Sequence, residues 1–297
     1  MKDVANGRLA PESRGVLYVV GTPIGNLQDI TLRALQTLQD VDLIAAEDTR
    51  NTRRLLAHHG IDRPLISLHE HNEDRRAVEL VSKLETGLNA ALVSDAGTPT
   101  LSDPGYRLVK VATAGGIKVV PIPGPSAAIA ALSVSGLPTD SFVFLGFPPR
   151  KQAKRLKFLH QAAKQSQTLI FYESPKRMAD LLGDLQDVMG ERQAVLSREM
   201  TKRYEEFIRG KLGDIAAAVQ QRKELKGECT LLVEGVKKHQ EMSEQTLREI
   251  ITRELDRGEV GVSALSRQIA KQYGISKNRV YEEVLVTKRQ RDKEIDI

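Results

Sequence analysis

Short runs rich in Val, Ile and Leu alternate with longer amphipathic segments along most of this 297-residue chain. Such alternation is typical of an α/β protein, in which helices cover a largely parallel sheet. In the first half the pattern predicts strands over residues 16–20, 43–46, 65–68, 90–94 and 118–122, and helices over 29–39, 49–58, 72–85, 106–114 and 125–135. In the second half it predicts strands over 142–145, 168–172, 193–198, 204–208 and 230–234.

The pattern changes twice, and the changes predict the domain boundaries. A turn-rich seam lies near residues 136–140, and after Gly235 the strand pattern stops, so that a linker over 237–240 leads into helical sequence. We therefore expect a flexible N-terminus over 1–14, an α/β domain over 15–138, a second α/β domain over 139–236 and a helical tail over 237–297. The length is that of about two ordinary domains plus a small appendage.

Composition excludes several classes of protein. A single cysteine, Cys229, excludes an internal disulfide framework and a cysteine-clustered zinc site. The six His show no metal-ligand spacing and no G-x-S-x-G motif occurs, so we expect neither a metal site nor a serine hydrolase. The N-terminus lacks the layout of a secretory signal, and the uncharged stretch 119–139 is interrupted by four prolines. We expect a cytoplasmic protein that does not enter a membrane.

Four strand ends in the first half carry the residues that turns and binding loops use. They are residues 21–26 (GTPIGN), 47–50 (EDTR), 94–105 (SDAGTPTLSDPG) and 121–128 (PIPGPSAA). The carboxyl ends of parallel strands are where ligands bind in such folds, and the loop 94–105 is longer than a plain connector needs. In that loop Asp95 is able to accept from a cationic group, whereas Asp48 or Thr49 is placed to cap the following helix. The glycine spacing fits neither a dinucleotide fingerprint nor a Walker A loop.

Two strand ends in the second half place carboxylates beside cations. They are residues 171–177 (FYESPKR) and 197–202 (SREMTK). Such pairs orient polar substrates in clefts, but exposed ion pairs have the same appearance in a sequence.

The basic excess of the chain is concentrated in the second half. Residues 1–141 carry 14 basic and 16 acidic groups, residues 142–236 carry 17 and 12, and residues 237–297 carry 13 and 11. No acidic residue occurs between Phe142 and Tyr172, where the apolar spacing predicts an amphipathic helix with a cationic outer face, formed by Arg150, Lys151, Lys154, Arg155 and Lys157. A one-signed stripe suits a phosphate backbone, although a solvated surface helix is the simpler alternative.

The tail has the spacing of a helix-turn-helix. Ala270, Gly274, Ile275 and Val280 occupy its small, turn and core positions, and Ser276 is placed to cap the second helix. Glu283 stands where that motif is usually apolar, so a plain helical hairpin is an equally good interpretation.

Together these motifs resemble the tetrapyrrole-methylase-like superfamily of S-adenosylmethionine-dependent methyltransferases, and within it the branch that modifies small-subunit ribosomal RNA. The resemblance covers nearly the whole two-domain core, in segments 17–35, 42–56, 92–109, 121–138, 171–177, 197–206 and 227–235. It implies a class III methyltransferase fold of two α/β domains, usually a homodimer, that binds S-adenosyl-L-methionine in the cleft and needs no metal. The implied reaction is 2′-O-methylation of the ribose of a decoding-centre cytidine in 16S ribosomal RNA, within the small subunit.

The resemblance also assigns residues. By motif position, cofactor binding falls on Pro23, Ser94, Asp95, Ala96, Gly97, Thr98, Pro123, Ser126, Ala127, Tyr172 and Cys229. As hypotheses for the chemistry, Glu47, Glu173 and Glu199 are candidate bases, and Arg50, Arg198 and Lys202 are candidates to bind phosphate or polarise the ribose. The sequence departs from the family motifs at Met200 and at residues 100–102. The alternatives are a precorrin methyltransferase and a ligand-sensing regulator that binds nucleic acid through its tail.

Overall fold

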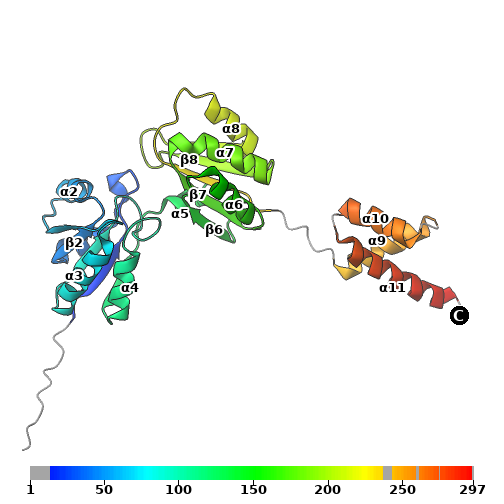
Figure 1. The fold of residues 1–297 in the computed structure, drawn as a ribbon, viewed down its shortest axis with the longest axis horizontal. Helices are drawn as coiled ribbons and strands as arrows, with labels where there is room; N and C mark the ends of the chain where they lie inside the picture. The colour runs from blue at the N-terminus through cyan, green and yellow to red at the C-terminus, as the bar shows by residue number, and fades with distance from the viewer. Residues whose placement is uncertain (1–13, 237–242, 259–260, 274, 296–297) are drawn as a thin grey trace, which may run out of the picture. The chain divides into compact units, whose positions relative to one another are not determined.

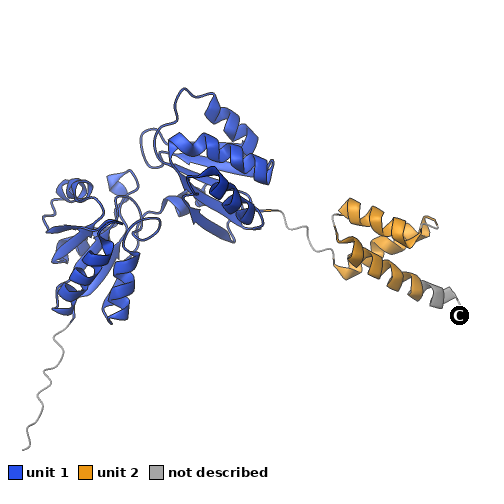
Figure 2. Cartoon of the chain, viewed as in Figure 1, with its two compact units in different colours: residues 1–235 blue, residues 236–297 orange. Residues whose placement is uncertain are grey.

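The computed structural model describes residues 14–236, 243–258, 261–273 and 275–295. The chain forms two compact units, residues 1–235 and 236–297 (Figure 2). The N-terminus that was predicted to be flexible lies, up to residue 13, outside the described residues, as do the predicted linker 237–240 and Gly274.

The first sheet of unit 1 is entirely parallel, as predicted. Its strands run in the order β3 (Leu65–Ser67), β2 (Leu43–Ala46), β4 (Ala90–Val93), β1 (Val16–Val20) and β5 (Lys118–Ile122). A short 3-10 turn, η1 (Leu27–Asp29), precedes the helices α1 (Leu32–Asp40), α2 (Thr49–His58), α3 (Glu73–Glu85), α4 (Tyr106–Ala114) and α5 (Ala127–Ser133). One face of the sheet packs on α3 and α4, and the other packs on α1 and α2 (Figure 1). All five carboxyl ends therefore meet at one edge.

The second sheet is mixed, so the prediction of a largely parallel sheet is wrong for this half. The strand order is β6 (Phe142–Gly146), β7 (Thr168–Glu173), β10 (Cys229–Val233), β8 (Gln193–Arg198) and β9 (Glu206–Lys211). Only β6 and β7 are parallel, because β8 and β9 form a hairpin and β10 inserts antiparallel between β7 and β8. The ends of β7 and β8 still share an edge, since Glu173 and Arg198 both lie opposite Cys229.

The two faces of the second sheet have different partners. One face packs on α6 (Gln152–Ala162), α7 (Pro175–Met189) and α8 (Leu212–Gln220) around a large hydrophobic core. The other face packs on α5 of the first half, where Ala131 and Leu132 contact a cluster that includes Ile170, Val195 and Leu232. This buried contact fixes the edge of one sheet beside the edge of the other.

Unit 2 is a three-helix module of α9 (Glu244–Asp256), α10 (Val262–Tyr273) and α11 (Lys277–Ile295). Its core includes Leu247 and Ile251 of α9, Leu265 of α10 and Val280 of α11. Glu283, the residue that departs from the helix-turn-helix pattern, forms an ion pair with Arg248 of α9. Among the described residues, no helix has the length and apolar character required to cross a membrane.

Candidate functional site

The loops at the carboxyl edge of the first sheet lie against one another. A Cβ atom added to Gly21 would come within 2.8 Å of the Cα of Gly124, so only glycine permits the loops after β1 and β5 to approach this closely. Thr22 and Gly97 exchange two backbone hydrogen bonds of 2.8 and 3.1 Å, and Gly97 has a φ of +81°. The three strand ends that the sequence singled out after β1, β4 and β5 therefore converge.

A cavity of about 410 Å³ opens where these loops meet the edge of the second sheet. Its volume lies within the ~300–1,000 Å³ range of small-molecule sites. Eight of the eleven residues predicted to bind the cofactor line it: Asp95, Ala96, Gly97, Thr98, Ser126, Ala127, Tyr172 and Cys229. The candidate bases Glu47 and Glu173 line it as well.

Three residues of the predicted cofactor set lie elsewhere. Ser94 is buried beneath the loop, and its carbonyl accepts a hydrogen bond of 3.1 Å from Thr22 Oγ1. Pro23 lines a neighbouring cavity. Pro123 is exposed, and its carbonyl accepts a 3.4 Å hydrogen bond from Thr31 Oγ1. All three support the loops without lining the main cavity.

Carboxylates gather on the first-half wall of the cavity. Burial raises the pKa of Asp103 to about 6, and the neighbouring charge of Glu47 adds to the shift. Burial also raises the pKa of Glu47, although the backbone N–H of Asp95 donates to its Oε2 at 3.3 Å and opposes the shift. Asp103 is not among the site residues predicted from the sequence. The repetition of Ser-Asp at 94–95 and 102–103 in one loop was the signal that pointed to it.

The loop that carries Asp103 is conformationally strained. Thr100 and Ser102 adopt φ angles of +76° and +67°, which non-glycine residues seldom occupy. Strain of this kind costs of order 1–3 kcal/mol per residue and persists where the surrounding structure enforces it, often at functional sites. Residues 100–102 are also where the sequence departs from the family motif, and two of them, Leu101 and Ser102, line the cavity.

Tyr172 connects the second sheet to α5. Its hydroxyl accepts a 3.1 Å hydrogen bond from the backbone N–H of Ala128, one of the unpaired donors in the first turn of that helix. The edges of Phe144 and Phe147 pack against its ring, with centroid separations of 4.9 and 5.7 Å. Burial raises the pKa of Tyr172, so the hydroxyl stays protonated.

Glu173 is a buried carboxylate with one oxygen unused. Its Oε1 accepts from the backbone N–H of Ser174 at 2.6 Å and from Nε of Arg177 at 2.8 Å. Its Oε2 is buried and has no hydrogen-bond partner among the described residues. Buried polar atoms are rarely left without a partner, so this oxygen is a candidate acceptor for an N–H-bearing ligand.

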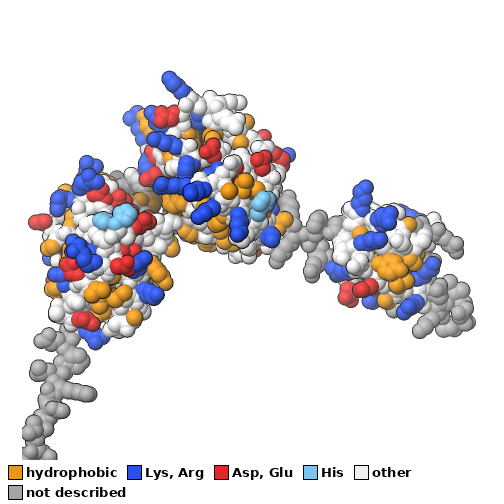
Figure 3. All heavy atoms as spheres, viewed as in Figure 1, with side chains coloured by type: hydrophobic (Ala, Val, Ile, Leu, Met, Phe, Trp, Pro, Cys, Tyr) orange, Lys and Arg blue, Asp and Glu red, His pale blue; other side chains and the backbone are white. Residues whose placement is uncertain are grey.

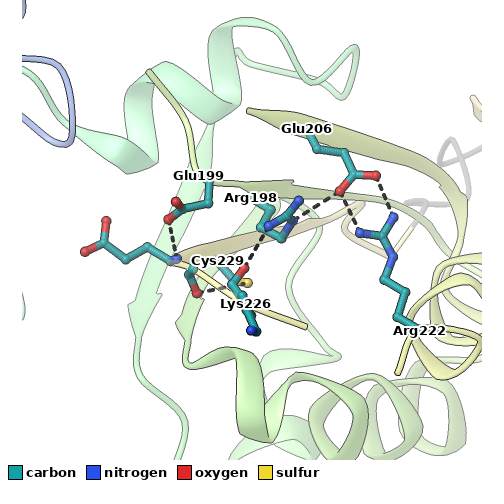
Figure 4. Close-up of polar contacts among 8 residues, drawn as sticks. Arg198, Glu199, Glu206, Arg222, Lys226 and Cys229 are labelled. Atoms are coloured by element: carbon teal, nitrogen blue, oxygen red, sulfur yellow. Dashed lines mark hydrogen bonds and ion pairs between the residues drawn. The ribbon is translucent and has the colours of Figure 1, made fainter. Parts of the chain in front are cut away.

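Arg198 belongs to an ion-pair network that stabilises one wall of the main cavity. Figure 4 shows the carboxylate of Glu206 between the guanidinium groups of Arg198 and Arg222, at 3.1 and 2.5 Å. Hydrogen bonds from Arg222 and then Arg198 lower the pKa of Glu206 to about 2. Arg198 also donates to the carbonyl of Lys226 at 2.9 Å. The network therefore fixes the loop before β10, which supplies Gly227 and Glu228 to the cavity.

Glu199 and Lys202 form a clamp beside the main cavity. Nζ of Lys202 lies 2.9 Å from Glu199 and 3.0 Å from Glu228, and the contact with Lys202 lowers the pKa of Glu199. The stem of Lys202 covers Gly25 of the first half, where an added Cβ would come within 2.6 Å of Lys202 Cγ. Neither residue lines the main cavity.

Arg50 is highly exposed and pairs with Asp48 at 2.6 Å. Asp48 also caps α2, as predicted, by accepting from the backbone N–H of Arg50 at 2.8 Å.

The cationic helix forms as predicted, with one correction. Arg150, Lys151, Lys154 and Lys157 are exposed, and Lys and Arg side chains gather over α6 in Figure 3. Arg155 is instead buried, and its Nε pairs with Asp184 of α7 at 2.6 Å. The prediction that Arg155 belongs to the outer, RNA-facing stripe is therefore wrong, because the side chain lies on the same inner face of the helix as Leu159 and Ala162.

Fold and cavity together define a methyltransferase of the tetrapyrrole methylase class. The family model described as Tetrapyrrole (Corrin/Porphyrin) Methylases matches residues 16–216. The crystal structure of a cobalt precorrin-4 methyltransferase shares the fold, with a TM-score of 0.56 at 17% identity over 76% of this chain and 98% of that one.

Curated relatives show which family within this class the chain belongs to. Proteins named ribosomal RNA small subunit methyltransferase I from Escherichia coli O157:H7 and Haemophilus influenzae are 48% and 47% identical to this chain, over 93% and 90% of its length and 96% and 95% of theirs. The chain therefore belongs to the ribosomal RNA small subunit methyltransferase I family. The resemblance inferred from the motifs and the class III fold with C-terminal helices are both confirmed.

Proposed function

We propose that this chain uses S-adenosyl-L-methionine to methylate the ribose 2′-hydroxyl of a decoding-centre cytidine in 16S ribosomal RNA. The main support is the cavity, which gathers eight residues of the family's cofactor motifs beside two candidate bases. The names of the relatives support ribosomal RNA of the small subunit as the substrate. At 47–48% identity these relatives favour RNA over the alternative of a precorrin substrate, whereas the precorrin enzyme shares only the fold.

The chemistry of the cavity fits this donor. S-adenosyl-L-methionine supplies an electrophilic methyl group on a cationic sulfonium and also carries an ammonium group. Asp103 and the unused Oε2 of Glu173 offer negative charge to these cations. The small residues Ala96, Gly97 and Ala127 leave backbone groups accessible to the polar edges of the nucleoside.

The residues then have to align donor and acceptor and exclude water. Holding both in one site removes most of the entropic cost of a bimolecular displacement. A ribose hydroxyl is a weak nucleophile, so a nearby base assists by taking its proton. Glu47 suits this role best, because it lines the cavity and burial moves its pKa toward neutrality. Glu173 is already paired with Arg177, and the contact with Lys202 lowers the pKa of Glu199, which makes Glu199 a weaker base.

The exposed stripe of Arg150, Lys151, Lys154 and Lys157 is proposed to bind the RNA backbone. Reversing the three lysines to Glu should weaken RNA binding and flatten its salt dependence while S-adenosyl-L-methionine still binds normally. A control that reverses the exposed Arg63, Lys110 and Lys118 makes the same change of net charge elsewhere. Equal losses of RNA affinity in the two variants would show that the stripe contributes only through the net charge of the chain.

The remaining proposals concern the setting of the enzyme. We infer a cytoplasmic homodimer that needs no metal and acts on the small ribosomal subunit, with the three-helix module contributing to RNA recognition or packing. Light scattering of the purified full chain tests the dimer directly.

The decisive test in cells is a map of ribose methylation on small-subunit ribosomal RNA with and without this protein. The proposal expects one decoding-centre mark to disappear when the protein is absent. An unchanged map would contradict it.

A further inference from the structure

A second cavity, of about 280 Å³, adjoins the main one. The two share four lining residues, Ile24, Asp95, Ala96 and Glu228. These four residues face both cavities, so a group bound in the second cavity lies next to a group bound in the main one. Pro23 and Lys202, which the sequence singled out as candidate site residues, line this second cavity and not the main one.

Two of the residues that both cavities share, Asp95 and Glu228, are held in place by the protein. Oδ1 of Asp95 accepts from the backbone N–H of Asp48 at 3.1 Å, and its Oδ2 accepts from Nδ2 of Asn51 at 2.8 Å. On the opposite side Glu228 is held by Lys202 at 3.0 Å. Both oxygens of Asp95 accept hydrogen bonds from the protein, so this carboxylate needs no ligand of its own.

The second cavity combines apolar walls with a cationic rim. Pro23, Ile24, Leu27 and Leu55 supply apolar surface, on which a sugar or base ring can lie. Arg54 of α2 stands at the rim; it is exposed and forms no ion pair among the described residues. The volume is just below the ~300–1,000 Å³ of ligand-sized pockets, which is room for one nucleotide and not for a duplex.

We propose that this second cavity is the acceptor subsite, which holds the target nucleotide with Arg54 on a phosphate and presents the ribose to the main cavity. The inference rests on the proposed function, because it requires an RNA acceptor. Enzymes that modify nucleotides commonly take the target out of its stack into such a pocket. An arginine binds phosphate with charge-assisted and often bidentate hydrogen bonds.

The chain offers a matched control one residue away. Arg53 is also an exposed arginine of α2 without an ion pair among the described residues, but it lines a different cavity, formed with residues 60–63. Adjacent positions on a helix point in directions about 100° apart, so the two arginines reach different surfaces. Arg53→Ala and Arg54→Ala remove the same charge from the same helix.

The experiment measures methyl transfer from labelled S-adenosyl-L-methionine to small ribosomal subunits purified from cells that lack this protein. We expect Arg54→Ala to lower kcat/KM for the subunit about tenfold, corresponding to one lost charged contact, and to reduce the slope of log K against log salt by about 0.7. Arg53→Ala should stay within about twofold of wild type. Leu27→Trp, which fills the apolar part of the cavity, should also reduce transfer. All variants should bind S-adenosyl-L-methionine as wild type does in calorimetry.

Three results would overturn the acceptor subsite. If Arg54→Ala transfers methyl groups as fast as wild type, Arg54 makes no phosphate contact. If Leu27→Trp transfers as fast as wild type, the nucleotide binds elsewhere. Equal losses of transfer in the Arg53 and Arg54 variants would indicate only a general effect of charge. If the wild-type chain itself transfers no methyl group to the subunit, the proposed function fails and the subsite fails with it. Transfer by wild type together with an unaffected Arg54 variant rejects the subsite alone.

Discussion

Arg155 is expected to stabilise the fold and to make no contact with RNA. The side chains of Arg155 and Asp184 are 5% and 7% exposed, with Nε and Oδ2 at 2.6 Å. Gln152 donates to the second oxygen of Asp184 at 3.1 Å. Replacing Arg155 by Ala leaves a buried carboxylate without its countercharge, and breaking a buried pair in this way costs about 3–5 kcal/mol. At about 2–4 °C per kcal/mol for a unit of this size, the melting temperature should fall by roughly 6–20 °C.

Urea unfolding followed by circular dichroism measures this loss, and Lys154→Ala is the matched control on the same helix. Lys154 is exposed, so its replacement should change the free energy of unfolding by no more than about 0.5 kcal/mol. The double variant Arg155→Met, Asp184→Leu removes both charges and should recover most of the stability. The reasoning is refuted if Arg155→Ala is as stable as wild type and binds RNA as weakly as Lys154→Ala does. Such a result would indicate that Arg155 lies on the outer face of the helix.

Three further predictions concern the main cavity. The pKa of Asp103 is about 6 in the folded chain against an ordinary 3.8, so the ionised carboxylate destabilises the fold above pH 6, and this effect disappears as the pH falls toward 3.8. Asp103→Asn should therefore raise the free energy of unfolding at pH 8 but not at pH 4. Equal gains at both pH values in urea titrations would contradict this prediction. Tyr172→Phe leaves the N–H of Ala128 without its acceptor, so it should lower the free energy of unfolding by about 1–3 kcal/mol and weaken S-adenosyl-L-methionine binding in calorimetry. An unchanged stability and an unchanged affinity would show that the hydroxyl is dispensable. Burial raises the pKa of Cys229 to about 11, so the thiol of the folded protein should resist iodoacetamide at pH 8 and react only in urea. Mass spectrometry measures this difference in labelling. Fast labelling of the folded protein would disprove the prediction.

The first half of the fold was predictable because each strand and its following helix form a local unit. Parallel strands with alternating helices leave few possible arrangements, and their carboxyl ends then meet at one edge. The convergence of Thr22, Gly97 and Gly124 followed from this rule without knowledge of any contact. The order of the second sheet did not follow, because the insertion of β10 between β7 and β8 depends on pairing between segments about 30 and 60 residues apart.

The errors within the site have a common physical origin. The spacing of Arg155 with Leu159 and Ala162 indicates the buried face of the helix, but the charge alone indicated the surface. What permits its burial is Asp184, which stands on another helix and carries no local signal. The Ser-Asp repeat was a local signal for Asp103, but its raised pKa was not predictable, since burial within the folded loop and the charge of Glu47 produce it.

The most direct test of the account is transfer by the purified chain to a defined position. Small subunits from cells lacking this protein are incubated with the chain and labelled S-adenosyl-L-methionine, and the RNA is then hydrolysed in alkali, which cannot cleave beside a 2′-O-methyl ribose. The account predicts one labelled, alkali-resistant dinucleotide that begins with a cytidine of the decoding centre and is absent with Glu47→Gln but present with the exposed control Glu85→Gln. Label on a base, on another region of the RNA, or on no RNA at all would contradict it.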